Sequence, residues 1–302
     1  MSKSTRWFLV ILGVLALFAI GAILVFVSLI GKVRDDSTET VVSGSGEKIA
    51  VVELRGVISS SEEVVRQLRT YREQHSIRAI LLHIDSPGGS VVPSQEIYEE
   101  VKRTKESGKP VVVSMGSLAA SGGYYVACPA SKIVANKGTL TGSIGVISEF
   151  LQVYEGLNKL GIGVKTIKAG KLKDAGSPTR PMNDDDIAYF QSVMDEVHDQ
   201  FIAAVEDGRK MKHEDVVRLA DGRVFTGMQA VKIGLVDTIG TYEDAIRITA
   251  AMVGIKGEPA LVKEHKRQSF LQSVFGDAES ALKDFKQDAL DRPVMSYRFV
   301  QP

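Results

Sequence analysis

Residues 49–85 read IAVVELRGVISSSEEVVRQLRTYREQHSIRAILLHID, and the spacing of apolar residues in this stretch indicates the fold class. The runs 49–58 and 77–85 are rich in β-branched residues and have the length of strands, whereas 60–73 has the apolar spacing of a helix. A strand, a helix and a second strand in succession are typical of a parallel βαβ unit. Because the second run is almost wholly apolar, its strand is expected to be covered on both faces.

The same alternation of strands and helices continues along the chain. Helices are expected at 93–106 and at about 152–160, and strands at 110–116, 132–136, 142–147 and 163–169. The clearest long helix is 184–206, where apolar residues form one stripe that is expected to pack in the core or against another subunit. Short helices and strands then complete one α/β domain with a parallel sheet, which is expected to span 48–265.

Length, charge and cysteine content exclude several classes of protein. The 302 residues fit one large domain with appendages better than two full domains. The 37 basic and 37 acidic residues balance, which argues against nucleic acid as a partner because phosphate binding requires a basic surplus on one face. The single cysteine, Cys128, is interpreted as a small buried apolar residue. No histidines, cysteines or carboxylates have metal-ligand spacing, so no metal or organic cofactor is expected.

The N-terminus predicts a membrane anchor. Trp7 to Ile30 is an almost wholly apolar run, and as a helix rising 1.5 Å per residue it exceeds the roughly 30 Å hydrocarbon core of a bilayer. The run is longer than the apolar region of a cleaved signal peptide, and no evident cleavage site follows it. Lys3 and Arg6 precede the run without acidic neighbours, which favours a cytoplasmic N-terminus and an exported body. Residues 1–34 are therefore expected to form one uncleaved transmembrane helix.

Two further segments flank the domain. Residues 35–47 are polar and rich in serine and glycine, which is typical of a flexible tether. In the tail, 266–302, apolar residues recur at helical spacing among lysine, aspartate and glutamate. This pattern predicts an amphipathic helix that packs against a neighbour and ends in an irregular segment, with a mobile tail as the alternative.

One predicted strand ends in the turn DSPGGS, residues 85–90. A Pro-Gly-Gly turn at the carboxyl end of a parallel strand places backbone N–H groups where such sheets bind ligands. The amides of Gly88 and Gly89 are therefore candidates for stabilising an oxyanion. The alternative is a plain turn between a strand and a helix.

A second predicted strand ends in SMGSLAASGGYY, residues 114–125. The small residues around Ser121 suit a nucleophile at the start of a helix, where N–H groups point toward developing negative charge. The motif is not the G-x-S-x-G nucleophile elbow, because Ala119 replaces its first glycine. Ser114 and Ser117 are alternative nucleophiles, but Ser114 lies in or at the end of the strand and Ser117 lacks the following glycine pair. A helix N-cap is the structural alternative for Ser121.

A serine nucleophile requires a base, and histidine is the usual one. Of the five histidines, only His83 lies on a strand that approaches the site. His83 and Asp85 point to the same side of that strand, and the flanking apolar residues predict that this side is packed. A Ser–His–Asp triad is therefore disfavoured.

Lysine is the alternative base, provided that burial or a cationic neighbour lowers its pKa from about 10.4 toward neutrality. The segment KTIKAGKLKDAGSPTR, residues 165–180, supplies four candidates: Lys165, Lys168, Lys171 and Lys173. A solvated basic loop is the alternative interpretation of this segment. Spacing alone does not choose between the four lysines.

These segments occur together in the order that is found in one family. The sequences D-S-P-G-G, S-M-G-S-x-A-A-S-G-G-Y-Y, L-T-G-S-I-G-V and I-K-x-G-x-x-K-D…S-P-x-R resemble the signal peptide peptidase A family, over roughly residues 48–250. The resemblance implies the Clp-protease/crotonase-like fold, which is built from repeated ββα units. It also implies that Ser121 is the nucleophile and Lys173 the base, with the Ser143 hydroxyl bonded to that lysine. The amides of Gly89 and Gly122 would then form the oxyanion hole.

The resemblance further implies a setting for the reaction. It predicts a serine endopeptidase of the bacterial cytoplasmic membrane that cleaves peptides, remnant signal peptides among them, on the exported side. A homo-oligomer is expected, with each dyad completed across a subunit boundary, because longer members of the family join two such domains in one chain. Two alternatives remain: a crotonase-type acyl-CoA enzyme, which would be expected to lack an anchor and to carry acidic catalytic residues, and a non-catalytic membrane scaffold.

Overall fold

The computed structural model describes residues 7, 17–18, 20–21, 38–265 and 296–299. Most of the predicted anchor and the predicted amphipathic helix of the tail lie outside these residues. Within the described part of the chain, no helix combines the length and the apolar composition that crossing a membrane requires. Residues 41–263 and the described C-terminal residues belong to one compact unit, to which the following account refers.

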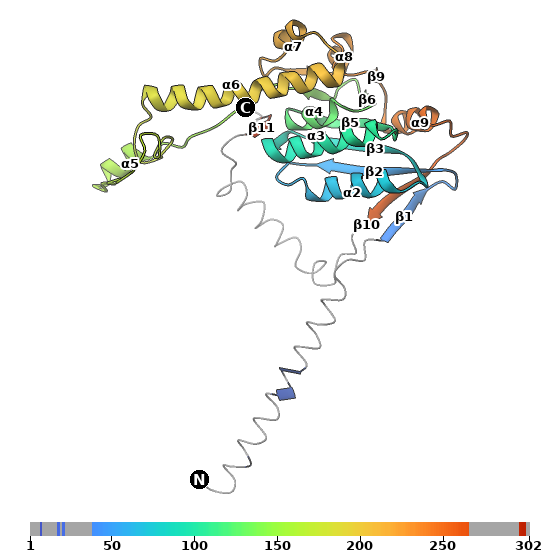
Figure 1. The fold of residues 1–302 in the computed structure, drawn as a ribbon, viewed down its shortest axis with the longest axis horizontal. Coiled ribbons are helices and arrows are strands. Elements are labelled where there is room, and N and C mark those ends of the chain that lie inside the picture. Colours follow the sequence, from blue (N-terminus) through green and yellow to red (C-terminus); the bar gives the residue numbers. More distant parts are fainter. Residues whose placement is uncertain (1–6, 8–16, 19, 22–37, 266–295, 300–302) are drawn as a thin grey trace. The chain divides into compact units, whose positions relative to one another are not determined.

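A largely parallel sheet organises this unit (Figure 1). Its strands are β1 (Thr38–Ser43), β2 (Lys48–Arg55), β3 (Ile77–Ser86), β5 (Val111–Ala120), β6 (Lys132–Ala135), β7 (Leu140–Gly142), β8 (Val224–Thr226), β9 (Thr238–Ile239) and β10 (Ala260–His265). They lie in the order β1-β10-β2-β3-β5-β6-β9, and β7 adds to β5 and pairs antiparallel with β8. The predicted α/β class with a parallel sheet is therefore confirmed.

The helices cover both faces of this sheet. They are α2 (Glu62–Glu73), α3 (Val91–Glu106), α4 (Gly122–Ala127), α5 (Tyr154–Lys159), α6 (Asp184–Arg209), α7 (His213–Leu219), α8 (Gly227–Lys232) and α9 (Tyr242–Met252). On β3, Leu82 faces the core beneath α2 and α3, whereas its neighbour Leu81 faces α9. Because burial of a leucine side chain stabilises by roughly 1.5–3 kcal/mol, strands that are buried on both faces hold their carboxyl ends in fixed positions.

Two predicted strands are absent from the structure as it is described. Of the predicted strand 142–147, only its first residue lies in a strand, because β7 ends at Gly142 and the chain turns at Ser143, whose φ is 51°. Residues 163–169 are irregular, and Ile167 is 91% exposed. Their β-branched residues favour a strand, but a strand forms only where a neighbouring edge supplies hydrogen bonds, and this segment has none.

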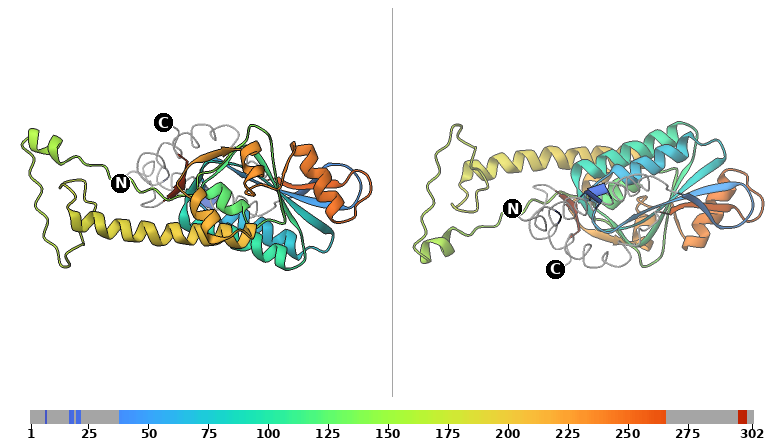
Figure 2. Two further views of the ribbon diagram at one scale, coloured as in Figure 1. Left: turned by 90° about the horizontal axis from the view of Figure 1, so that it is seen from above. Right: turned by 90° about the horizontal axis from the view of Figure 1, so that it is seen from below.

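The long helix α6 is confirmed, and its two halves have different surroundings. The C-terminal half packs on the core through Val197, Phe201 and Ile202, which are buried. The N-terminal half continues the same apolar stripe, but Ile187 is 53% exposed. Figure 2 shows that this half extends beyond the sheet and carries α5 and the loops around it away from the other helices. We call residues 149–183, from the end of the β7 loop to the N-cap of α6, the arm.

Candidate active site

The candidate nucleophile lies where β5 passes directly into α4. Ser121 is buried and has φ 53° and ψ −119°, which is a strained conformation for a residue with a Cβ atom. Two main-chain hydrogen bonds hold it: its N–H donates to the Gly142 carbonyl at 2.8 Å, and its carbonyl accepts from the Tyr125 N–H at 2.8 Å. The hydroxyl makes no capping hydrogen bond. Helix capping therefore does not explain a serine at this position.

Two of the predicted oxyanion donors meet beside this serine. The short strand β4 (Gly88–Ser90) follows β3, and its Gly89 amide faces the first turn of α4. A Cβ atom on Gly122 would lie 3.1 Å from the Gly89 nitrogen and 2.6 Å from the Ser94 Oγ. A Cβ atom on Gly88 would lie 2.5 Å from the Gly122 nitrogen. The glycines therefore allow the two amides to approach one point in space.

Ser143, the predicted supporting hydroxyl, lies next to the residue that anchors the nucleophile. It follows Gly142, whose carbonyl accepts the Ser121 N–H, and its own N–H donates to the Arg223 carbonyl at 2.9 Å. Ser143 is buried and has a φ of 51°. Among the described residues, the non-glycine residues with positive φ are Ser121, Ser143 and Lys210, and Lys210 is an ordinary left-handed helix end. Backbone strain in the described chain is thus concentrated at the predicted site.

A strand from the C-terminus lies across this site, and the sequence analysis did not anticipate it; we call the space that this strand fills the groove. Strand β11 (Ser296–Arg298) pairs antiparallel with β4, and Tyr297 is opposite Gly89. On the other edge, Ser296 exchanges two main-chain hydrogen bonds of 3.1 Å with Ile147. A segment of extended chain therefore lies between β4 and residue 147, next to both predicted oxyanion donors.

Aromatic rings enclose one side chain of this strand, and we call the space between them the aromatic pocket. The Tyr297 side chain fills it, stacked on Tyr125 at 5.2 Å between ring centroids and tilted against Phe201 at 4.8 Å. Its hydroxyl donates to the Val197 carbonyl of α6 at 3.0 Å. Burial raises the pKa of Tyr297 above its ordinary value, so the phenol stays neutral. The pocket thus accepts a large aromatic side chain with one polar end.

The predicted base lies on the arm. Lys173 is exposed in a turn in which its N–H donates to the Gly170 carbonyl at 3.2 Å. In Figures 1 and 2 the chain between α5 and α6, which carries this turn, lies far from α4. Within one chain, the structure therefore does not bring Lys173 to Ser121.

The other three lysines of the segment differ in their partners. Lys168 is paired with Asp174, and Lys171 with Asp185 at 2.5 Å. Lys165 and Lys173 make no ion pair within the part of the chain that the structure describes. The four candidates thus divide into two lysines that form ion pairs and two that form none among the described residues.

An ion-pair network fixes the turn that carries Lys173. Arg180 donates two hydrogen bonds of 3.0 Å to the carboxylate of Asp174, and it also contacts Asp186 at 2.5 Å. These hydrogen bonds hold the pKa of the Asp174 carboxyl well below its usual range. Asp186 in turn closes a capping box with Asn183 at the start of α6. The residue next to Lys173 is thus tied to the first turn of α6.

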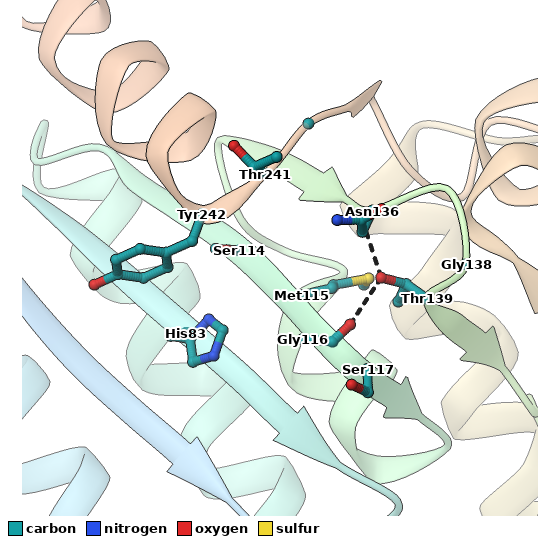
Figure 3. A pocket seen from close by; sticks show the side chains of 11 residues that line it. His83, Ser114, Met115, Gly116, Ser117, Asn136, Gly138, Thr139, Thr241 and Tyr242 are labelled. Carbon is teal, nitrogen blue, oxygen red and sulfur yellow. Dashed lines mark hydrogen bonds between the residues drawn. The ribbon is translucent and has the colours of Figure 1, made fainter.

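His83 and the two alternative serines line a different hollow, of about 360 Å³ (Figure 3). It lies beside α9, and its lining side chains include His83, Ser114, Met115, Ser117, Asn136, Thr139, Thr241 and Tyr242. His83 is packed only in part. Its ring makes a T-shaped contact with Tyr242, with 5.2 Å between the ring centroids, and the residue also borders this hollow. Burial lowers the pKa of His83. Ser121, Gly89 and Gly122 do not line the hollow, and no aspartate is among its described lining residues, so His83 has no Ser–His–Asp triad there.

The close packing around Gly89 leads to a test of the oxyanion assignment. A Cβ atom at Gly89 would lie 2.2 Å from the Ile58 carbonyl oxygen, so Gly89→Ala must displace β4. We expect kcat for peptide cleavage to fall by about 10²–10³-fold, the usual effect of losing one oxyanion donor. Gly138→Ala is the matched control, because nothing lies within 4 Å of its Cβ position. Equal rates for both variants would contradict the assignment.

Comparison with known proteins identifies related peptidases. The family model described as "Peptidase family S49" matches residues 103–256. A protein of Synechocystis sp. that is named as a protease is 43% identical over 69% of this chain and 76% of its own length. A protein of Enterococcus faecium named signal peptide peptidase SppA is 33% identical over 85% of this chain and 78% of its own. Protease 4 of Haemophilus influenzae is 32% identical over 82% of this chain but only 41% of its own length.

Among solved structures, a ClpP1 variant from Listeria monocytogenes aligns with a TM-score of 0.45 and 18% identity, covering 65% of this chain and 93% of its own. The family match spans half of the chain, and the similar proteins cover most of it. The chain therefore belongs to peptidase family S49 and is a serine peptidase.

Proposed function

We propose that this peptidase is a membrane-anchored endopeptidase that uses Ser121 and Lys173 as a dyad. The observation that carries the proposal is the strained, buried Ser121 beside the amides of Gly89 and Gly122, in a groove that holds an extended peptide. Such a groove recognises main chain by adding a strand, so it admits unfolded peptides of varied sequence. Released signal peptides are substrates of this kind.

The reaction follows from these positions. The neutral amine of Lys173 accepts the proton of the Ser121 hydroxyl, and the resulting alkoxide attacks the carbonyl carbon of the substrate. The Gly89 and Gly122 amides donate hydrogen bonds to the oxyanion that forms. The peptide bond then breaks, the amine product leaves with a proton, and the acyl group stays on Ser121. Water, deprotonated by Lys173, releases the acyl group and restores the serine.

The lysine of each site comes from a neighbouring subunit of a homo-oligomer. Support comes from the arm, because Lys173 lies on it, away from the nucleophile of its own chain. The arm also exposes large apolar side chains: Leu151 by 76%, Leu160 by 75% and Ile167 by 91%. Apolar surface of this kind is typical of a protein interface. An arm that docks on the next subunit would bury these side chains and, in the same contact, bring Lys173 to the Ser121 of that subunit.

The anchor places this activity at a bilayer. The apolar run from Trp7 to Ile30 and the basic residues that precede it support a single-pass helix with a cytoplasmic N-terminus. The peptidase domain then lies on the exported side of a bacterial cytoplasmic membrane, joined by the tether 35–47. Signal peptides remain in that membrane after their release from preproteins, so anchored active sites would meet them there.

One preparation tests anchor and activity together. Membranes from cells that produce the full chain are washed with alkaline carbonate and incubated with a synthetic signal peptide, and the products are identified by mass spectrometry. We expect cleavage in the washed membranes and none in membranes that carry Ser121→Ala. Activity found only in the wash would contradict the anchor. Hydrolysis of an acyl-CoA with no cleavage of the peptide would contradict the proposed reaction.

A further inference from the structure

Arg180 holds the residue that follows the proposed base. Its Nε and Nη2 groups each donate a hydrogen bond of 3.0 Å to a different oxygen of the Asp174 carboxylate. Nη2 also donates to the main-chain carbonyl of Asp174 at 3.0 Å. One side chain therefore fixes both the main chain and the side chain of the residue next to Lys173, which limits where the main chain of Lys173 can lie.

The same guanidinium reaches an acidic residue of α6. Nη2 donates to one oxygen of the Asp186 carboxylate at 3.0 Å, and Nη1 donates to the other at 2.5 Å. Asp186 is buried, and its capping box with Asn183 ties it to the first turn of the helix. The C-terminal half of α6 packs on the core, so this contact connects the turn of Lys173 to the body of the domain. The planar fork of an arginine suits two carboxylates, whereas a lysine amine would not hold both in one geometry.

The contact with Asp174 also removes a competitor for the base. A free carboxylate beside Lys173 would hold its ammonium in an ion pair, and a protonated amine cannot accept the proton of Ser121. Hydrogen bonds from Arg180, and then from Lys168, lower the pKa of Asp174, so this carboxylate is ionised and could form such a pair. Its oxygens are instead engaged by these two cations, and Lys173 makes no ion pair among the described residues.

We propose that Arg180 is a positioning residue of the peptidase, which fixes the turn of Lys173 on α6 and keeps the Asp174 carboxylate away from the Lys173 amine. The inference rests on the proposed role of Lys173 as the base. Arg180 need not touch the substrate, because it acts through the residue next to the base. Its two effects have different signatures. Loss of position lowers the rate at every pH, whereas a released carboxylate changes the pH at which activity appears.

The first test is the rate of Arg180→Gln, a change that keeps amide donors but removes the charge and the fork. We expect kcat for a synthetic signal peptide to fall by about 100-fold, the usual effect of a small misplacement of a catalytic group, with KM changed by less than about threefold because the groove is untouched. Lys171→Gln is the matched control, since it removes another ion pair between the arm and the first turn of α6, the exposed pair of Lys171 with Asp185. This control should cleave within about twofold of the parent rate.

The second test is the pH profile of kcat/KM. In Arg180→Gln the Asp174 carboxylate keeps only Lys168 as a cationic partner and can also pair with Lys173. This pairing opposes loss of the proton from Lys173, so the acid limb should move to higher pH by about one pH unit. The double variant Arg180→Gln/Asp174→Asn lacks the carboxylate, and its acid limb should return to the parent position while kcat stays low. A merely structural role would lower the rate without moving the limb, so an unmoved limb in Arg180→Gln would overturn the proposal.

A third measurement separates this inference from the proposed function. Ser121→Ala subunits supply an intact Arg180 and Lys173, so mixing them with Arg180→Gln should restore activity to roughly a quarter of the parent rate, which also shows that the groove of the variant is folded. If the same partner restores Lys173→Ala but not Arg180→Gln, the defect lies outside the arm and the proposal is wrong. A parent-like rate in Arg180→Gln beside an inactive Lys173→Ala also overturns it, and the proposed function then stands. If Lys173→Ala cleaves at the parent rate, the proposed function fails together with the inference.

Discussion

Replacement of Ser121 by alanine is expected to reduce peptide cleavage by about a millionfold, the usual cost of removing the nucleophile of a serine peptidase. The hydroxyl makes no capping hydrogen bond, and the main-chain bonds to Gly142 and Tyr125 do not need it. Unfolding free energy should therefore change by less than about 1 kcal/mol. The rate is measured with a fluorogenic peptide, and stability by thermal unfolding of the same preparation.

Ser117→Ala is the matched control for this change. Ser117 was the alternative nucleophile that follows the same strand, and its side chain borders the hollow beside α9 rather than the groove (Figure 3). Its alanine variant should cleave within about twofold of the parent rate. Ser117 is exposed and lies away from the groove, and substitutions at such surface positions usually have small effects on the folded structure. Loss of activity in Ser117→Ala with retention in Ser121→Ala would reverse the assignment.

The central strands could be predicted from the sequence because parallel strands buried on both faces leave continuous apolar runs. The runs 49–58, 77–85 and 110–116 correspond to β2, β3 and β5, with ends that differ by a few residues. The predicted strand at 163–169 was wrong because local β-propensity carries no information about whether a neighbouring edge exists. Ile167 is exposed, so it does not belong to the core.

One part of the candidate site could also be predicted from the sequence. Turns at the carboxyl ends of two parallel strands made the amides of Gly88 and Gly89 and the hydroxyl of Ser121 candidates, and the family resemblance paired Gly89 with Gly122. Tyr297 could not be predicted, because its pairing with β4 joins segments about two hundred residues apart. The sequence SYRFV has β-branched and aromatic residues that favour a strand. The sequence analysis expected an irregular segment at this end of the chain and did not use this pattern.

The position of Lys173 determines how a dyad with Ser121 can form. Motif resemblance assigns it as the base, yet the arm carries it away from Ser121 of the same chain. An arm of one subunit that reaches the groove of the next, as we propose, would satisfy both observations. Lys173→Ala should then be as inactive as Ser121→Ala, whereas Lys165→Ala, which removes the other candidate lysine that has no ion pair among the described residues, should remain active.

Each inactive variant keeps one half of such a shared site. A Ser121→Ala subunit still carries an intact Lys173 on its arm, and a Lys173→Ala subunit still carries an intact Ser121 in its groove. When the two are mixed in equal amounts and exchange subunits at random, roughly a quarter of the sites receive both intact residues. Activity should therefore rise from background to roughly a quarter of the parent rate.

The most direct measurement is the peptide cleavage rate of this mixture after subunit exchange in detergent, with exchange followed by fluorescence transfer between labelled subunits. The account predicts that both variants alone are inactive and that the mixture regains activity in step with exchange. A mixture that exchanges fully and stays inactive would contradict a dyad shared between subunits, and so would a monomer that cleaves at the parent rate.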